Sequence, residues 1–153
     1  METDTVNFVT LSVMKDSPTR LLKKDSYDLI DFLPEPVSKG KGNYFEVEQY
    51  LLKHGKKIQG HFIQFFLKLY CYMDFDVDYN KKEYSNPSPK KLASLIKDSW
   101  NKQLILQIKT GKLDFLLSGD DLYITVYGLD ETTRPLVEKL AASENLFVRS
   151  RTL

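Results

Sequence analysis

Aspartates recur at every second position in the segment Asp74-Phe75-Asp76-Val77-Asp78, and carboxylates at this spacing could bind a cation. A calcium loop of the EF-hand type starting at Asp74 would need glycine at its sixth position and glutamate at its twelfth. The chain has Tyr79 and Ser85 there, so the sharp turn and the bidentate ligand are both missing. In an extended segment alternate side chains share one face, so the aspartates predict an acidic stripe that is either solvated or faces a partner. A metal site is the remaining interpretation.

The other chemistry-bearing side chains form no catalytic arrangement in the sequence. The only histidines, His54 and His61, have no third ligand at a spacing that zinc sites use. Cys71 lies in an apolar helical pattern, which predicts a buried and unreactive thiol. The adjacent carboxylates Asp120 and Asp121 occupy a turn that aspartate favours by itself. The sequence therefore predicts no enzyme activity, no cofactor and no bound metal.

Charge is balanced over the whole chain but segregated along it. The 22 Lys and Arg residues nearly match the 21 Asp and Glu residues, giving a net charge of +1. Residues 81–112 carry eight lysines and two acids, whereas residues 113–148 carry seven acids and two basic residues. The acidic part suits a basic protein partner, because complementary fields speed encounter. The lysine-rich part allows an alternative, a nucleic-acid-binding or regulatory module, although it contains no arginine and few aromatic rings to stack on bases.

Two acidic clusters and the tyrosines beside them are the predicted partner-binding residues. A tyrosine in polar surroundings suits an interface, because its rigid ring adds contact area and its hydroxyl stays satisfied. Tyr84 and Tyr127 are further tyrosines of this kind. The predicted partner-binding set is Asp74, Asp76, Asp78, Tyr79, Asp120, Asp121 and Tyr123.

The order of the helices and strands expected around these residues predicts one α+β domain over residues 1–153. It has an antiparallel sheet and a C-terminal hairpin packed against several helices. Periodicity predicts strands over residues 6–13, 113–117, 122–127 and 146–149, and helices over residues 44–54, 60–73 and 134–142. A further helix starts at Pro89 behind Ser88, and Gly111 can close it. Residues 27–33 fit either a strand or a short helix, and residues 74–89 read as polar and turn-rich. The core is expected to centre on Phe62, Phe65, Phe66 and Leu69.

The C-terminal part of the chain resembles a known group of proteins. Residues 111–128 (GKLDFLLSGDDLYITVYG) and 134–148 (RPLVEKLAASENLFV) resemble the corresponding part of small bacterial immunity proteins. These are the antidotes of contact-dependent growth inhibition and related polymorphic toxin systems. The resemblance implies a non-enzymatic cytoplasmic protein that binds a cognate toxin C-terminal domain, often a nuclease, and blocks its active site or substrate access. A membrane is not expected, since the chain has no long apolar run, and direct nucleic-acid contact is not expected, since the net charge is only +1.

Overall fold

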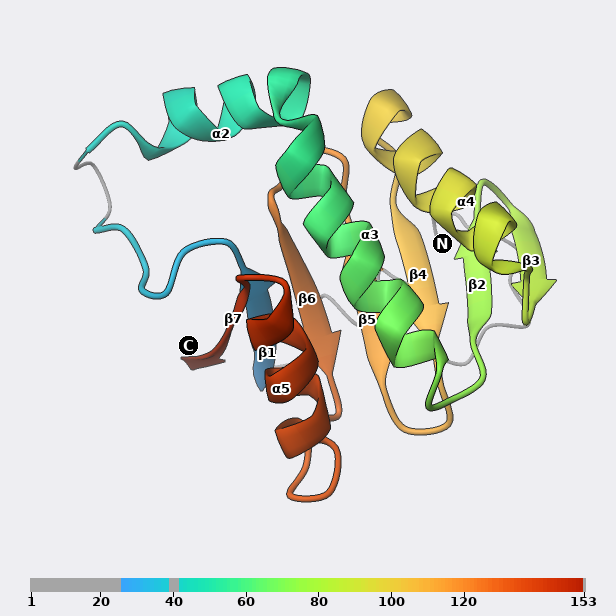
Figure 1. Cartoon of the computed structure of the whole chain (residues 1–153). Coiled ribbons are helices and arrows are strands. Elements are labelled where there is room, and N and C mark those ends of the chain that lie inside the picture. The colour runs from blue at the N-terminus through green and yellow to red at the C-terminus, as the bar shows by residue number, and fades with distance from the viewer. Residues whose placement is uncertain (1–25, 39–41, 153) are drawn as a thin grey trace.

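Seven antiparallel strands form one sheet in the computed structural model, which describes residues 26–38 and 42–152 (Figure 1). The order across the sheet is β3-β2-β4-β5-β6-β1-β7. The α+β class is thereby confirmed, and the strand predicted over residues 6–13 lies outside the described residues. The strands are β1 (Ser26–Asp31), β2 (Asp76–Tyr79), β3 (Lys82–Ser85), β4 (Leu106–Lys109), β5 (Asp114–Leu117), β6 (Tyr123–Tyr127) and β7 (Phe147–Thr152).

Helices pack on one face of this sheet, and one further helix lies across its end (Figure 1). The packed helices are α3 (Lys56–Tyr70), α4 (Pro89–Lys102) and α5 (Arg134–Ser143), and the crossing helix is α2 (Tyr44–His54). The Ser88 hydroxyl accepts a hydrogen bond from the Lys91 amide at 3.1 Å, so the predicted cap of α4 is confirmed. The predicted hairpin and the helix over residues 134–142 are confirmed as β5, β6 and α5.

The core lies between α3 and the sheet, as the aromatic face of this helix predicts. Phe62, Phe65, Phe66 and Leu69 are all buried. The Phe66 ring makes edge contacts with three other aromatic rings, at centroid distances of 5.1 Å to Phe65, 6.4 Å to Phe75 and 5.2 Å to Phe115. Edge-on aromatic contacts add to the free energy of area burial. The centre of the core therefore agrees with the sequence prediction.

Two segments differ from the sequence prediction. Residues 74–89 contain the hairpin β2–β3, whose turn residues Asn80 and Lys81 both have positive φ. The helix from Pro89 ends at Lys102 rather than near Gly111, because Gln103 adopts a left-handed conformation and the chain then enters β4. The apolar residues of β4 belong to a central strand of the sheet, and this burial outweighs continuation of the helix.

The position of Cys71 is a further difference. Its side chain was expected to be buried on the core helix, but α3 ends at Tyr70 and Cys71 is exposed. Tyr72 follows it with 63% of its side chain exposed. The apolar pattern of α3 therefore continues into the sequence beyond the helix, where the chain has already turned away from the core.

Candidate functional site

Helix α2 packs Leu51 and Leu52 against the core but leaves three large apolar side chains exposed. Phe45 is 67% exposed, Val47 is 46% exposed and Tyr50 is 63% exposed. We call these three residues the α2 surface. Tyr44, Val47 and Tyr50 recur at the three-residue spacing of one helix face, but the only buried residue of α2 is Glu48. Large exposed apolar side chains gathered on one element are typical of protein-binding surfaces.

Two local features hold α2 across the end of the sheet. Gly55 joins α2 to α3, and a Cβ atom there would lie 2.6 Å from the carbonyl oxygen of Leu51. Glycine is thus required by this close approach rather than by a left-handed backbone, because its φ is −88°. The buried Glu48 carboxylate accepts hydrogen bonds from the Leu122 amide at 3.1 Å and from the Tyr44 hydroxyl at 2.9 Å. The bond from Leu122 ties α2 to the loop between β5 and β6, and the bond from Tyr44 lies within α2 and orients the carboxylate.

The loop between β5 and β6 presents the second predicted acidic cluster beside α2. Gly119 packs against the end of α4, where a Cβ atom would lie 2.4 Å from the Cα atom of Gln103. Asp120 is exposed and Asp121 is partly buried. Burial raises the pKa of Asp121 to about 6, and the neighbouring carboxylates of Glu48 and Asp120 add to this increase. The loop therefore carries a carboxylate whose charge a cationic partner would stabilise.

Replacing Asp121 by asparagine is expected to stabilise the fold at pH 7.5. Between pH 3.8 and about 6 the folded protein holds a proton on Asp121 that the unfolded chain has released. The free energy of unfolding therefore falls as the pH rises through this range. Because solvent screens a partly buried group, we expect a gain of about 1 kcal/mol at pH 7.5 and none at pH 4. Urea unfolding at both pH values measures it, with Asp76→Asn as the exposed control. An equal gain at both pH values would contradict this account of Asp121.

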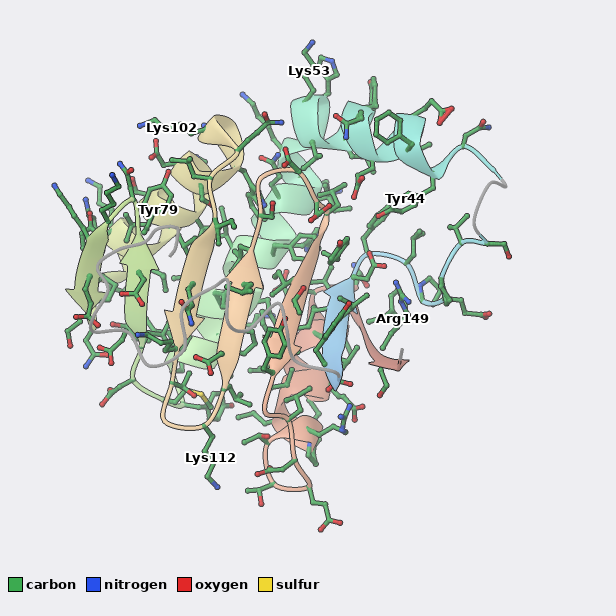
Figure 2. All side chains as sticks on the ribbon, turned by 180° about the vertical axis from the view of Figure 1, so that it is seen from behind. Tyr44, Lys53, Tyr79, Lys102, Lys112 and Arg149 are labelled. Atoms are coloured by element: carbon green, nitrogen blue, oxygen red, sulfur yellow. The ribbon has the colours of Figure 1, made fainter. Side chains whose placement is uncertain are left out.

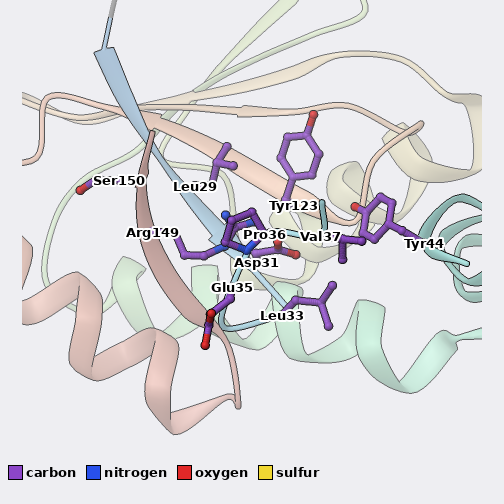
Figure 3. A pocket seen from close by; sticks show the side chains of 10 residues that line it. All are labelled: Leu29, Asp31, Leu33, Glu35, Pro36, Val37, Tyr44, Tyr123, Arg149 and Ser150. Carbon is purple, nitrogen blue, oxygen red and sulfur yellow. Dashed lines mark hydrogen bonds and ion pairs between the residues drawn. The ribbon is translucent and has the colours of Figure 1, made fainter. Parts of the chain in front are cut away.

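A cavity of about 480 Å³, which we call the β1 pocket, opens beside α2 (Figure 3). Tyr44 and Tyr123 stand on one side of it, with Arg149 and Ser150 on the other (Figure 3). Asp31 is 2% exposed; it accepts a hydrogen bond from the Phe32 amide at 2.7 Å and forms an ion pair with Arg149. The pocket is lined by Leu29, Asp31, Leu33, Glu35, Pro36, Val37, Tyr44, Tyr123, Arg149 and Ser150.

The sheet separates the two acidic clusters that sequence predicts. Asp120, Asp121 and Tyr123 lie at α2, and Tyr123 lines the β1 pocket. Asp74, Asp76, Asp78 and Tyr79 belong to β2 or its approach, three strands from β6 in the sheet order. At a strand spacing of about 4.8 Å, this places β2 about 14 Å from β6. The two clusters therefore do not form one site.

Of the predicted residues on β2 and its approach, only some are available to a partner. Phe75, Val77 and Tyr79 are buried on one face, so the predicted alternation of the segment is confirmed. The Asp78 carboxylate, however, is paired with the ammonium group of Lys109 at 2.9 Å. Tyr79 was expected at an interface, but it is buried and its hydroxyl donates a hydrogen bond to Asp98 at 2.7 Å. Tyr127 is likewise buried, whereas Tyr84 is partly exposed and lies under the Lys91 ammonium group.

The lysines of residues 81–112 do not gather into one surface. Lys102 and Lys112 lie at opposite ends of the molecule (Figure 2). Lys109 is paired with Asp78, and Lys102 lies 3.3 Å from Asp98. A protein that binds nucleic acid usually presents a continuous basic surface along the phosphate backbone. Lys102 and Lys109 are therefore partly neutralised, and Lys112 lies far from Lys102.

No family model matches the chain, and neither the curated proteins nor the solved structures that were compared with it provide a significant match. Within residues 26–38 and 42–152, no three His, Cys, Asp or Glu side chains are grouped closely enough to hold a metal ion. None of the helices in the described part of the chain combines the length and the apolar character needed to cross a membrane. The α2 surface, the loop of Asp120 and Asp121, and the β1 pocket are therefore the features on which a functional proposal rests.

Proposed function

We propose that the protein is a non-catalytic immunity protein that binds a cognate toxin domain, with a nuclease as the favoured toxin, in the bacterial cytoplasm. The observation that supports this most is that α2 exposes Phe45, Val47 and Tyr50, while the loop of Asp120 and Asp121 contacts the same helix through Glu48. Interfaces of high affinity combine a few buried aromatic anchors with a polar rim that excludes water. Phe45 and Tyr50 supply such anchors, and the loop of Asp120 and Asp121 supplies an acidic rim.

The charge of this rim favours a basic partner. A nuclease domain carries positive charge where it holds the phosphate backbone, and an acidic surface that docks there competes with the substrate. Opposite charges also steer the two proteins together, whereas desolvated contacts at the α2 surface slow their separation. The alternative function, nucleic-acid binding through residues 81–112, has less support because these lysines are dispersed and partly paired.

Two double variants separate the apolar contribution of the α2 surface from the electrostatic contribution of Asp120 and Asp121. Both are tested in one kinetic experiment with the toxin domain encoded beside this gene. Phe45→Ser/Tyr50→Ser should raise the dissociation rate about 100-fold, because truncating interface aromatic anchors costs about 2–4 kcal/mol. Asp120→Lys/Asp121→Lys should lower the association rate about tenfold at low salt, with a smaller effect at physiological ionic strength, where the screening length is about 8 Å. Surface plasmon resonance at two salt concentrations measures both rates.

Matched controls come from the opposite end of α3 and from β2. Tyr72→Ser removes a ring that is 63% exposed, the same fraction as Tyr50, beyond the other end of α3. Asp74→Lys/Asp76→Lys reverses two exposed carboxylates at β2. Both controls should bind like the wild type, and the melting temperature of each variant shows that it is folded. Unchanged rates in both double variants at the α2 end would refute this interface.

A further inference from the structure

The geometry points to the β1 pocket as the receptor for an arginine side chain of the partner protein. This inference rests on the proposed function, because it names the chemistry by which the partner is recognised at the same end of the molecule. The pocket adjoins α2 through Tyr44, so one partner can cover the α2 surface and insert a side chain into the cavity. Its volume of about 480 Å³ is within the range of sites that enclose a ligand.

The lining of the pocket fits both parts of an arginine side chain. Leu29, Leu33 and Val37 contribute apolar surface to the lining, which suits the three methylene groups of the stem. The rings of Tyr44 and Tyr123 stand together on one side of the cavity (Figure 3). A planar guanidinium group stacks on aromatic rings and donates several hydrogen bonds, which a compact ammonium group does less well.

The charges around the pocket favour a cation. Glu35 also lines the pocket, and its exposed carboxylate forms no hydrogen bond or ion pair with the described residues, so it is available to a guanidinium group. Arg149, the one basic side chain among the described lining residues, is already paired with Asp31. Behind the two tyrosines lie the further carboxylates of Glu48 and Asp121.

Burial and the carboxylates near the pocket both raise the pKa values of Tyr44 and Tyr123. Burial raises the pKa of Tyr123 to about 12, and the charges of Asp121 and Glu48 contribute to the increase. The pKa of Tyr44 is raised as well, mainly by burial, then by its hydrogen bond to Glu48 and by the charges of Glu48 and Asp31. Both hydroxyl groups therefore stay protonated and donate to carboxylates. An anionic ligand would meet repulsion from the same groups.

Titration of the full-length protein with Nα-acetyl-L-arginine methylamide tests the pocket without the toxin. We expect saturable amide chemical shift changes confined to the pocket, including Tyr123 and Arg149, and none with the corresponding glutamate derivative. Glu35→Gln should weaken binding about fivefold, as expected for a solvent-exposed ion pair. Glu83→Gln, an exposed glutamate on β3 at the far side of the sheet, should bind like the wild type. Absence of saturation, equal response to the glutamate derivative, or unchanged affinity of Glu35→Gln would overturn the inference.

A second measurement separates this inference from the proposed function. The toxin domain is tested for binding with each of its exposed arginines replaced in turn by alanine. Loss of affinity at one arginine, with no further loss when Glu35→Gln is combined with it, supports insertion into the pocket. If the toxin domain binds and no arginine matters, the pocket inference fails and the proposed function stands. If the arginine derivative binds and no toxin domain does, the proposed function fails and the pocket stands.

Discussion

Replacing Phe66 by alanine is expected to lower the free energy of unfolding by about 3–5 kcal/mol. The Phe66 ring is completely buried, and it contacts the rings of Phe65, Phe75 and Phe115. It thus joins α3 to β5 and to the approach of β2. The truncation removes apolar burial and leaves a cavity that rigid neighbouring rings cannot fill.

Urea unfolding followed by circular dichroism measures this loss. Tyr72→Ala is the matched control, because it removes an aromatic ring that is 63% exposed, and its effect should stay within about 0.5 kcal/mol. A loss below about 1 kcal/mol for Phe66→Ala would mean that α3 is not the centre of the core.

Replacing Asp31 by alanine should cost about 3 kcal/mol, because it strands the charge of Arg149 in a largely buried position. The Asp31 carboxylate is 2% exposed, and the Arg149 side chain is 19% exposed. The substitution also removes the acceptor of the Phe32 amide hydrogen bond. The pair links β1 to the edge strand β7, so local opening of β7 should accompany the loss.

A double-mutant cycle distinguishes the ion pair from simple truncation. Arg149→Met removes the second charge and keeps much of the apolar stem, so the double variant Asp31→Ala/Arg149→Met should recover part of the stability that Asp31→Ala loses. Hydrogen exchange of the β7 amides supplies an independent measure of the opening. Additive losses in the cycle would contradict the role assigned to this pair.

The sequence predicts those parts of the fold whose signals are local. The hairpin β5–β6 follows from two apolar segments around a four-residue turn, and α4 begins where Ser88 and Pro89 predict it. The strands β3 and β4 are missed, and β2 is indicated only as an extended acidic segment, for a physical reason. β2 and β3 are short and polar on one face, and β4 is recognisable only by its place between β2 and β5.

The candidate site is predictable only in part. The loop of Asp120 and Asp121 is visible in the sequence as an acidic turn. The exposure of Val47 and Tyr50 is not visible in the sequence, because their spacing equals that of a core-facing stripe. The residue of α2 that faces inward instead is Glu48. The β1 pocket depends on Asp31 and Arg149, which are 118 positions apart and meet only because β1 pairs with β7.

The survival of bacteria that express the neighbouring toxin domain tests the central claim most directly. Wild-type protein expressed in the same cells should restore growth, and Tyr72→Ser should protect equally well. Phe45→Ser/Tyr50→Ser, expressed at the same level and folded, should protect poorly because the complex dissociates too fast. Absence of protection by the wild type would contradict the proposed immunity function, and full protection by Phe45→Ser/Tyr50→Ser would contradict the role of the α2 surface.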